Sequence, residues 1–115
     1  MNYCQDGLQV YFATETQQYN YVQIYGHYEL QPYDVNYRPY FKMGFFGFWW
    51  DGIDLWWIGQ DNDKGQPRGF AYYDKDLFCP YQLSESNWAL LHGTSWQTAS
   101  FLGITCKYIF IETKQ

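Results

Sequence analysis

The sequence has little of what would indicate a helical, membrane-spanning or nucleic-acid-binding protein. No segment shows a sustained helical repeat, and the longest apolar runs, of about four or five residues, are too short to cross a bilayer. Charged residues make up 17% of the chain, and 12 acids against 7 bases give a net charge of −5, which disfavours binding to phosphates. We therefore expect no nucleic-acid partner and no membrane insertion.

The sequence also lacks the usual patterns of metal-binding residues. Its three cysteines are Cys4, Cys79 and Cys106, and its two histidines are His27 and His92. They form neither a C-x₂₋₄-C nor an H-x₃₋₅-H pair, so we expect no metal site and no cofactor. The odd number of cysteines allows either three free thiols or one disulfide with one thiol left over.

Signatures of catalysis are missing as well. There is no G-x-S-x-G elbow, and acids that could form a catalytic pair lie in sequences typical of turns. The segment 61–65 resembles the start of a calcium loop, but Gly65 and Tyr72 stand where further acidic ligands are needed. We expect a non-enzymatic protein without catalytic residues, with a small hydrolase as a remote alternative. The acids that could have formed a catalytic pair, and that lie in sequences typical of turns, are Asp51, Asp54, Asp61 and Asp63.

Aromatic residues are abundant instead. The 6 Trp, 13 Tyr and 9 Phe make up 24% of the chain, a composition that favours β-strands. The central stretch 45–59 predicts a hairpin of strands 45–50 and 55–59 around the turn pair Asp51-Gly52. The sequence predicts one all-β domain over residues 1–115, an antiparallel sandwich or small barrel of about eight strands, with residues 1–7 as a loose N-terminal segment. The other expected strands are 8–13, 19–30, 37–43, 69–73, 88–91 and 101–111, with a connector at 31–36 and a polar stretch after residue 95.

Two adjacent tryptophan pairs lie in the predicted hairpin. Neighbouring strand residues point to opposite faces, so one member of each pair should enter the core and the other should face outward. Trp56 and Ile58 share a face, and we expect them inside, with Trp57 outside. The expected exposed platform has as its ligand-binding candidates Trp49, Trp57, Tyr72 and Tyr40, unless most of these rings are buried between two layers.

Several short motifs resemble a pattern of small β domains that are found, often repeated, in secreted or surface animal proteins. Two features depart from that pattern: Asn36-Tyr37 replaces an Asn-Gly pair, and Cys4 is extra. The matching motifs are Gly26-His27-Tyr28-Glu29, Arg38-Pro39-Tyr40-Phe41, Trp49-Trp50-Asp51-Gly52, Trp56-Trp57-Ile58-Gly59, Cys79-Pro80, the pair Trp88 and Trp96, and Cys106.

This resemblance implies an extracellular or cell-surface, non-enzymatic module. It also implies that a disulfide, if one forms, joins Cys79 to Cys106. Together with the aromatic content it predicts a binding module for carbohydrate or protein that uses exposed Trp and Tyr. The alternative is a structural subunit whose copies assemble into an oligomer or fibre.

Overall fold

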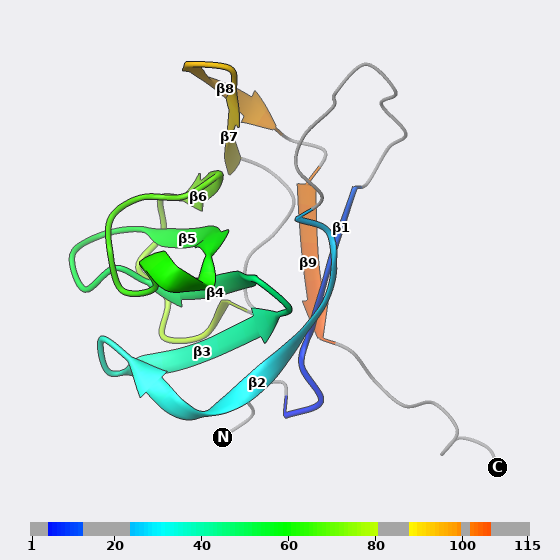
Figure 1. Ribbon diagram of the computed structural model, residues 1–115, viewed down its shortest axis with the longest axis vertical. Helices are drawn as coiled ribbons and strands as arrows, with labels where there is room; N and C mark the ends of the chain where they lie inside the picture. The colour runs from blue at the N-terminus through cyan, green and yellow to red at the C-terminus, as the bar shows by residue number, and fades with distance from the viewer. Residues whose placement is uncertain (1–4, 13–23, 81–87, 100–101, 107–115) are drawn as a thin grey trace, which may run out of the picture.

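The computed structural model describes residues 5–12, 24–80, 88–99 and 102–106. These residues form one sheet of nine antiparallel strands that curls into a half-barrel (Figure 1), and they contain no α-helix. The prediction of an all-β, antiparallel fold is confirmed, and of the two predicted forms the single curled sheet is nearer to the small barrel than to the sandwich. No helix in the described residues is long and apolar enough to span a bilayer.

Most strands pair with their neighbours in sequence. The order across the sheet is β8-β7-β6-β5-β4-β3-β2-β1-β9, so only β9 returns from a distance, to pair with β1. The elements are β1 (Leu8–Phe12), β2 (Gly26–Val35), β3 (Arg38–Met43), β4 (Phe46–Trp50), β5 (Trp56–Gln60), the 3₁₀ turn η1 (Asp61–Asp63), β6 (Ala71–Tyr73), β7 (Trp88–His92), β8 (Ser95–Ala99) and β9 (Leu102–Cys106).

Strand β2 forms the corner of the half-barrel. Its first three residues pair with β1, and the rest pair with β3 across an irregular register between Leu30 and Asp34. Pro32, which cannot donate a ladder hydrogen bond, lies inside this irregular segment. The predicted connector 31–36 is therefore wrong: β2 continues to Val35, and only Asn36 and Tyr37 form the turn. Of the predicted strand 19–30, residues 19–23 lie outside the described residues.

The central hairpin is confirmed, with Trp49 opposite Trp57 and Trp50 opposite Trp56. The polar stretch expected after residue 95 is instead a strand, β8, which pairs with β7 in a regular register. The sequence of β8 shows no alternation of apolar and polar residues, because the side chains from Ser95 to Thr98 are all exposed. The remaining predicted strands agree within a few residues, except that residues 13, 101 and 107–111 lie outside the described part.

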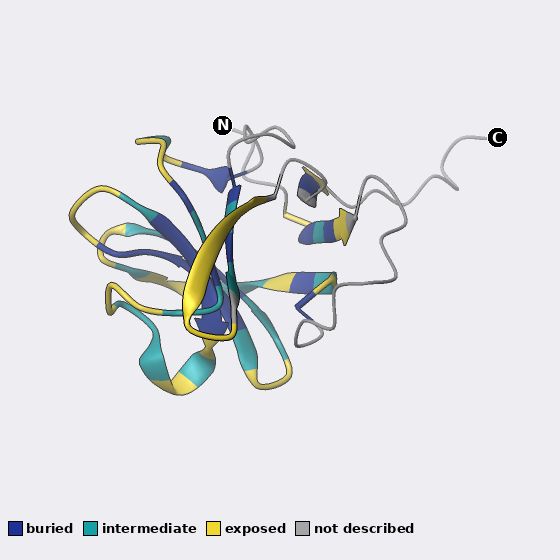
Figure 2. Cartoon of the chain, turned by 90° about the horizontal axis from the view of Figure 1, so that it is seen from above, coloured by how far each residue is buried: buried dark blue, intermediate teal, exposed yellow. Residues whose placement is uncertain are grey.

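The main core is built from one face of the curled sheet, with residues from every described strand except β8. Figure 2 shows where the strands are buried. The largest rings of the core pack edge to face, a favourable geometry for aromatic quadrupoles; the centroids of Phe48 and Trp56, for example, are 5.7 Å apart. The core members are Leu8, Val10, Ile24, Tyr28, Phe41, Phe48, Trp50, Trp56, Ile58, Ala71, Tyr73, Trp88, Leu90 and Ile104.

Candidate functional site

The opposite, convex face of the sheet carries a second aromatic cluster. We call it the outer cluster: Tyr40, Trp49 and Trp57, with Val35, Leu55 and Tyr72 packed against them. The two members of each tryptophan pair thus face opposite sides, as predicted, because Trp50 and Trp56 belong to the main core.

All four predicted ligand-binding residues therefore lie together in the outer cluster. Their predicted exposure is wrong for three of them, since Tyr40, Trp49 and Trp57 are buried. Only Tyr72 remains partly accessible. Among the described residues of the cluster, Val35, Leu55 and Tyr72 are partly accessible, so a ligand would meet the cluster at these three side chains.

Glycines explain how rings on the outside of the sheet become buried. Gly47 and Gly59 are paired across β4 and β5 and leave room for Tyr40 and Trp49. A Cβ on Gly59 would lie 2.9 Å from the Trp49 ring and 2.9 Å from the Cα of Gly69, so the 61–69 loop could not approach as closely. Glycine inside two aromatic strands was the sequence signal for this close approach.

The loops that cover the cluster also satisfy its polar atoms. The indole N–H of Trp49 donates to the Gln66 carbonyl at 2.9 Å, and that of Trp57 donates to the Asp51 carboxylate at 2.9 Å. The Tyr40 hydroxyl donates to the Asp61 carboxylate. Each buried ring is therefore tied to a loop by a hydrogen bond, and the cluster stabilises the loops.

Asp51 organises the loop between β4 and β5. Its Oδ1 accepts hydrogen bonds from the backbone N–H groups of Ile53, Asp54 and Leu55, and its Oδ2 accepts the bond from Trp57. Burial disfavours the charged carboxylate, but the four donors outweigh it and hold the pKa of Asp51 below its ordinary value. All four of these bonds come from the β4–β5 loop and from Trp57, and Asp51 is buried, so its carboxylate holds the loop against the outer cluster.

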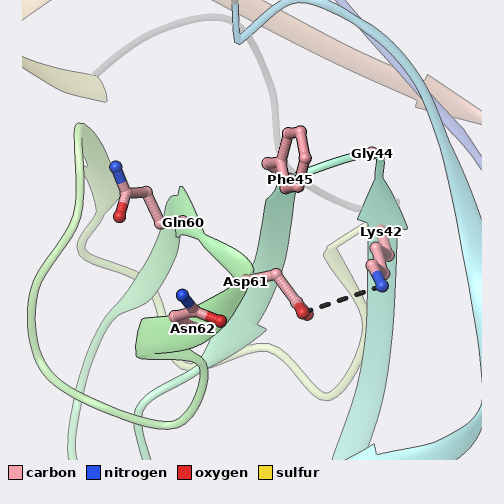
Figure 3. Close-up of a pocket in the computed structure, with 6 residues that line it drawn as sticks. All are labelled: Lys42, Gly44, Phe45, Gln60, Asp61 and Asn62. Carbon is pink, nitrogen blue, oxygen red and sulfur yellow. Dashed lines mark ion pairs between the residues drawn. The ribbon is translucent and has the colours of Figure 1, made fainter.

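A shallow pocket of about 480 Å³ lies beside Asp61, at the end of the sheet where β3 meets β4 (Figure 3). Burial opposes the charge on Asp61, but the Tyr40 hydroxyl and the ammonium groups of Lys64 and Lys42 lower its pKa overall. Both Lys Nζ atoms lie 3.7 Å from its oxygens. The carboxylate beside the pocket is therefore charged, and its charge is balanced by two lysine ammonium groups. Its lining consists of Lys42, Gly44, Phe45, Gln60, Asp61 and Asn62.

An accessible aromatic surface lies at the β8 edge of the outer cluster. The rings of Tyr72 and Trp96 meet edge to face with centroids 4.9 Å apart, and Trp96 also contacts Trp57 at 5.9 Å. Trp96 is 42% exposed. Ala89, which lies opposite Tyr72 on β7, is small enough for the Trp96 ring to reach across. We call Tyr72 and Trp96 the edge platform.

A second accessible surface lies at the turn between β2 and β3. Asn36 and Tyr37 have φ angles of 54° and 68°, as the tight type I′ hairpin turn requires. Glycine is the usual residue at the second of these positions, because a bulky side chain is strained there. Tyr37 is nevertheless 90% exposed, so its ring gains little from packing in return.

Asn36 joins this turn to the end of β4 and to the 61–69 loop. Its side-chain N–H₂ donates to the carbonyls of Trp50 at 2.9 Å and Gly65 at 3.1 Å. It also lies close to Gly52, whose added Cβ would be 3.1 Å from the Asn36 side chain. The next residue after Gly52 is Ile53, which is 69% exposed.

Tyr37 and Ile53 therefore project from adjoining, mutually braced loops. We call these two residues the loop tip. Two exposed carboxylates, Asp34 and Asp54, lie within a few residues of it, and neither forms an ion pair with a described residue. The loop tip was not predicted from the sequence. The one signal for it was Asn36-Tyr37, which stands where the resembled pattern has Asn-Gly.

The predicted Cys79–Cys106 disulfide is not formed: Cys79 carries a free, buried thiol. Cys79 lies near Asp34 and Arg38 at the turn end of β2, whereas the backbone of Cys106 pairs with Leu8 at the other end. These positions are about six residues, or roughly 20 Å, apart along β2, and a disulfide needs Cα atoms within about 7 Å.

Searches for related proteins gave no match among protein-family models, curated proteins or solved structures. The resemblance to small secreted or surface β domains therefore stays a prediction, and the site residues depend on the geometry described above.

Proposed function

We propose that this protein is a non-enzymatic binding module that contacts another protein through the loop tip. The observation that carries this proposal is Tyr37, a fully projecting aromatic ring at a strained backbone position. Strained residues without a packing role are concentrated at functional contacts. The extracellular or cell-surface location implied by the resemblance belongs to the same proposal.

The chemistry of the loop tip favours a protein partner over a carbohydrate. Carbohydrate platforms use flat, neighbouring rings, whereas the tip pairs one ring with the aliphatic Ile53. Tyrosine is enriched among the anchors of protein interfaces, Ile53 adds apolar area beside it, and the flanking Asp34 and Asp54 complement a basic rim. The expected partner surface has an apolar pocket edged by Lys or Arg.

The bracing of the loops also supports a binding role. Asn36 ties the turn to the backbone of the last β4 residue and of the 61–69 loop, and Asp51 fixes the loop that carries Ile53. A contact surface that is already ordered loses little conformational entropy on binding. Rigid loops on a packed sheet are a common arrangement for recognition.

The non-enzymatic part of the proposal has support in the state of three of the four turn acids and of the Cys79 thiol. Asp51 and Asp61 are engaged in structural hydrogen bonds and ion pairs, and Asp63 pairs with Arg68 at 3.8 Å. Burial raises the pKa of the Cys79 thiol to about 11; the charge of Arg38 lowers it in part and that of Asp34 raises it. Such a thiol is a poor nucleophile at neutral pH.

The test is to pan a displayed random-peptide library against the protein and to screen a glycan array in parallel. We expect selected peptides to combine Lys or Arg with apolar residues. Their affinity should fall at least about 30-fold for Tyr37→Gly, as expected for an interface anchor. Phe45→Ala is the matched control, because Phe45 is 88% exposed on the turn at the opposite end of β3. Peptides that bind Tyr37→Gly and Ile53→Ala as well as the unaltered protein would contradict the proposal.

A further inference from the structure

Strand β8 ends the described sheet with one side unpaired. On its inner side it pairs with β7 through five consecutive residue pairs, from Trp88↔Ala99 to His92↔Ser95, without a bulge. No strand among the described residues pairs with its outer side. Every second residue of β8 therefore directs its backbone N–H and C=O groups away from the sheet.

The turn before β8 determines which residues these are. Gly93 and Thr94 form a two-residue turn, with φ of 69° at Gly93 and no positive φ at Thr94, as in a type II′ hairpin. The pair that flanks such a turn, His92 and Ser95, exchanges both hydrogen bonds. Bonding pairs then alternate along the hairpin, so Trp96 and Thr98 direct their backbone groups outward.

The edge also lacks the features that keep sheet edges apart. Natural edge strands are protected by charged residues, proline or bulges. Strand β8, Ser-Trp-Gln-Thr-Ala, contains no charge and no proline, and its register is regular. It carries instead the exposed ring of Trp96, which belongs to the edge platform.

We propose that β8 pairs with β8 of a second copy of this chain, antiparallel about a twofold axis at Gln97. In this register Trp96 lies opposite Thr98 of the partner, and both are outward-bonding residues. The two strands then form two complete bonding pairs, with four backbone hydrogen bonds. A register centred on Trp96 or Thr98 would complete only one such pair among the residues of β8.

This arrangement joins the two edge platforms across the axis. Trp96 and Thr98 are on the same face of β8, so each Trp96 ring packs beside Thr98 of the partner. The edge platforms of the two copies therefore lie on the same face of the joined sheet. The two Gln97 side chains meet on the axis on the other face, where neutral amides can donate to and accept from each other. The surface used is separate from the loop tip, so the dimer and the proposed partner can bind together.

Sedimentation velocity of the full chain over a concentration series tests the proposal. We expect the unaltered protein to pass from monomer to dimer, and Gln97→Lys to raise the dimer Kd at least about tenfold because two like charges then oppose each other on the axis. Gln66→Lys, which adds the same charge to an exposed loop residue, should leave the Kd unchanged.

A mixture of Gln97→Lys and Gln97→Glu provides the decisive arm. Opposite charges then face each other on the axis, so the mixture should dimerise although each variant alone does so poorly. A monomer at all concentrations, a Gln97→Lys dimer as tight as the original, a mixture without recovery, or open-ended growth of fibres would each overturn the proposal.

Discussion

Trp57 and Asp51 are joined by a 2.9 Å hydrogen bond from the indole N–H to Oδ2, between a buried ring of the outer cluster and the first residue of the β4–β5 loop. The same carboxylate accepts three backbone N–H groups of that loop. One acid thus couples the packing of the convex face to the conformation of the loop that carries Ile53.

Replacing Asp51 should destabilise the protein strongly. Asp51→Ala leaves three loop N–H groups and the Trp57 indole without an acceptor, so we expect a loss of about 3 kcal/mol in the free energy of unfolding, measured by urea denaturation. Asp51→Asn should cost less, because its carbonyl oxygen can still accept the backbone donors while its amide faces the indole donor. An unchanged midpoint for Asp51→Ala would contradict this role.

The low pKa of Asp51 and Asp61 predicts acid sensitivity. Their pKa values are lower in the folded protein than in the unfolded chain, so their stabilising contribution is complete above about pH 4 and is lost as the pH falls through the folded values. The melting temperature should therefore fall as the pH drops below about 4. In Asp51→Asn the melting temperature should fall less on acidification, because only the contribution of Asp61 remains. A fall equal to that of the unaltered protein would mean that other acids cause the acid sensitivity.

Both central tryptophans should be essential to the fold. Trp56 is in the main core and Trp57 in the outer cluster, and both are buried. Trp56→Ala and Trp57→Ala should each lower the free energy of unfolding by about 3–5 kcal/mol. Ile53→Ala, at an exposed position of the adjacent loop, is the control and should change it by less than about 0.5 kcal/mol. A folded Trp57→Ala with normal stability would restore the interpretation of Trp57 as an exposed contact residue.

Tyr37 should be replaceable by glycine with a gain in stability. Glycine relieves about 1–2 kcal/mol of strain at a positive φ but costs about 0.5–1 kcal/mol more chain entropy on folding, so a net gain of up to about 1.5 kcal/mol is expected. Chemical denaturation measures it. A loss above 1 kcal/mol would mean that the ring packs against the fold, which would remove the argument for an outward contact.

Cys79 should be chemically inert in the folded protein. With a pKa of about 11 it is roughly one part in a thousand thiolate at pH 8, and burial blocks access to it. Alkylation followed by peptide mapping should therefore modify Cys79 only after unfolding. Rapid native labelling, or recovery of a Cys79 disulfide from unreduced protein, would contradict the structure.

The sequence alone determined the fold class and the central hairpin. Period-two patterns and the Asp51-Gly52 turn depend on local chemistry, so strands and their pairing could be predicted from residues close in the chain. Opposite faces for Trp49 and Trp50, and for Trp56 and Trp57, followed from strand geometry alone. The sequence named Tyr40, Trp49, Trp57 and Tyr72 as candidates, but their gathering on one face follows from the registers between the strands.

Only the tertiary structure decided which of these rings are accessible. Exposure of Trp49 depends on the 61–69 loop folding back over Gly59, a contact that strand periodicity does not contain. In the same way Cys79 was separated from Cys106 by the length of β2, and Tyr37 became the projecting ring because Asn36 bonds to backbone groups distant in sequence. Local pattern determines which face a side chain takes, whereas burial depends on what the rest of the chain places over that face.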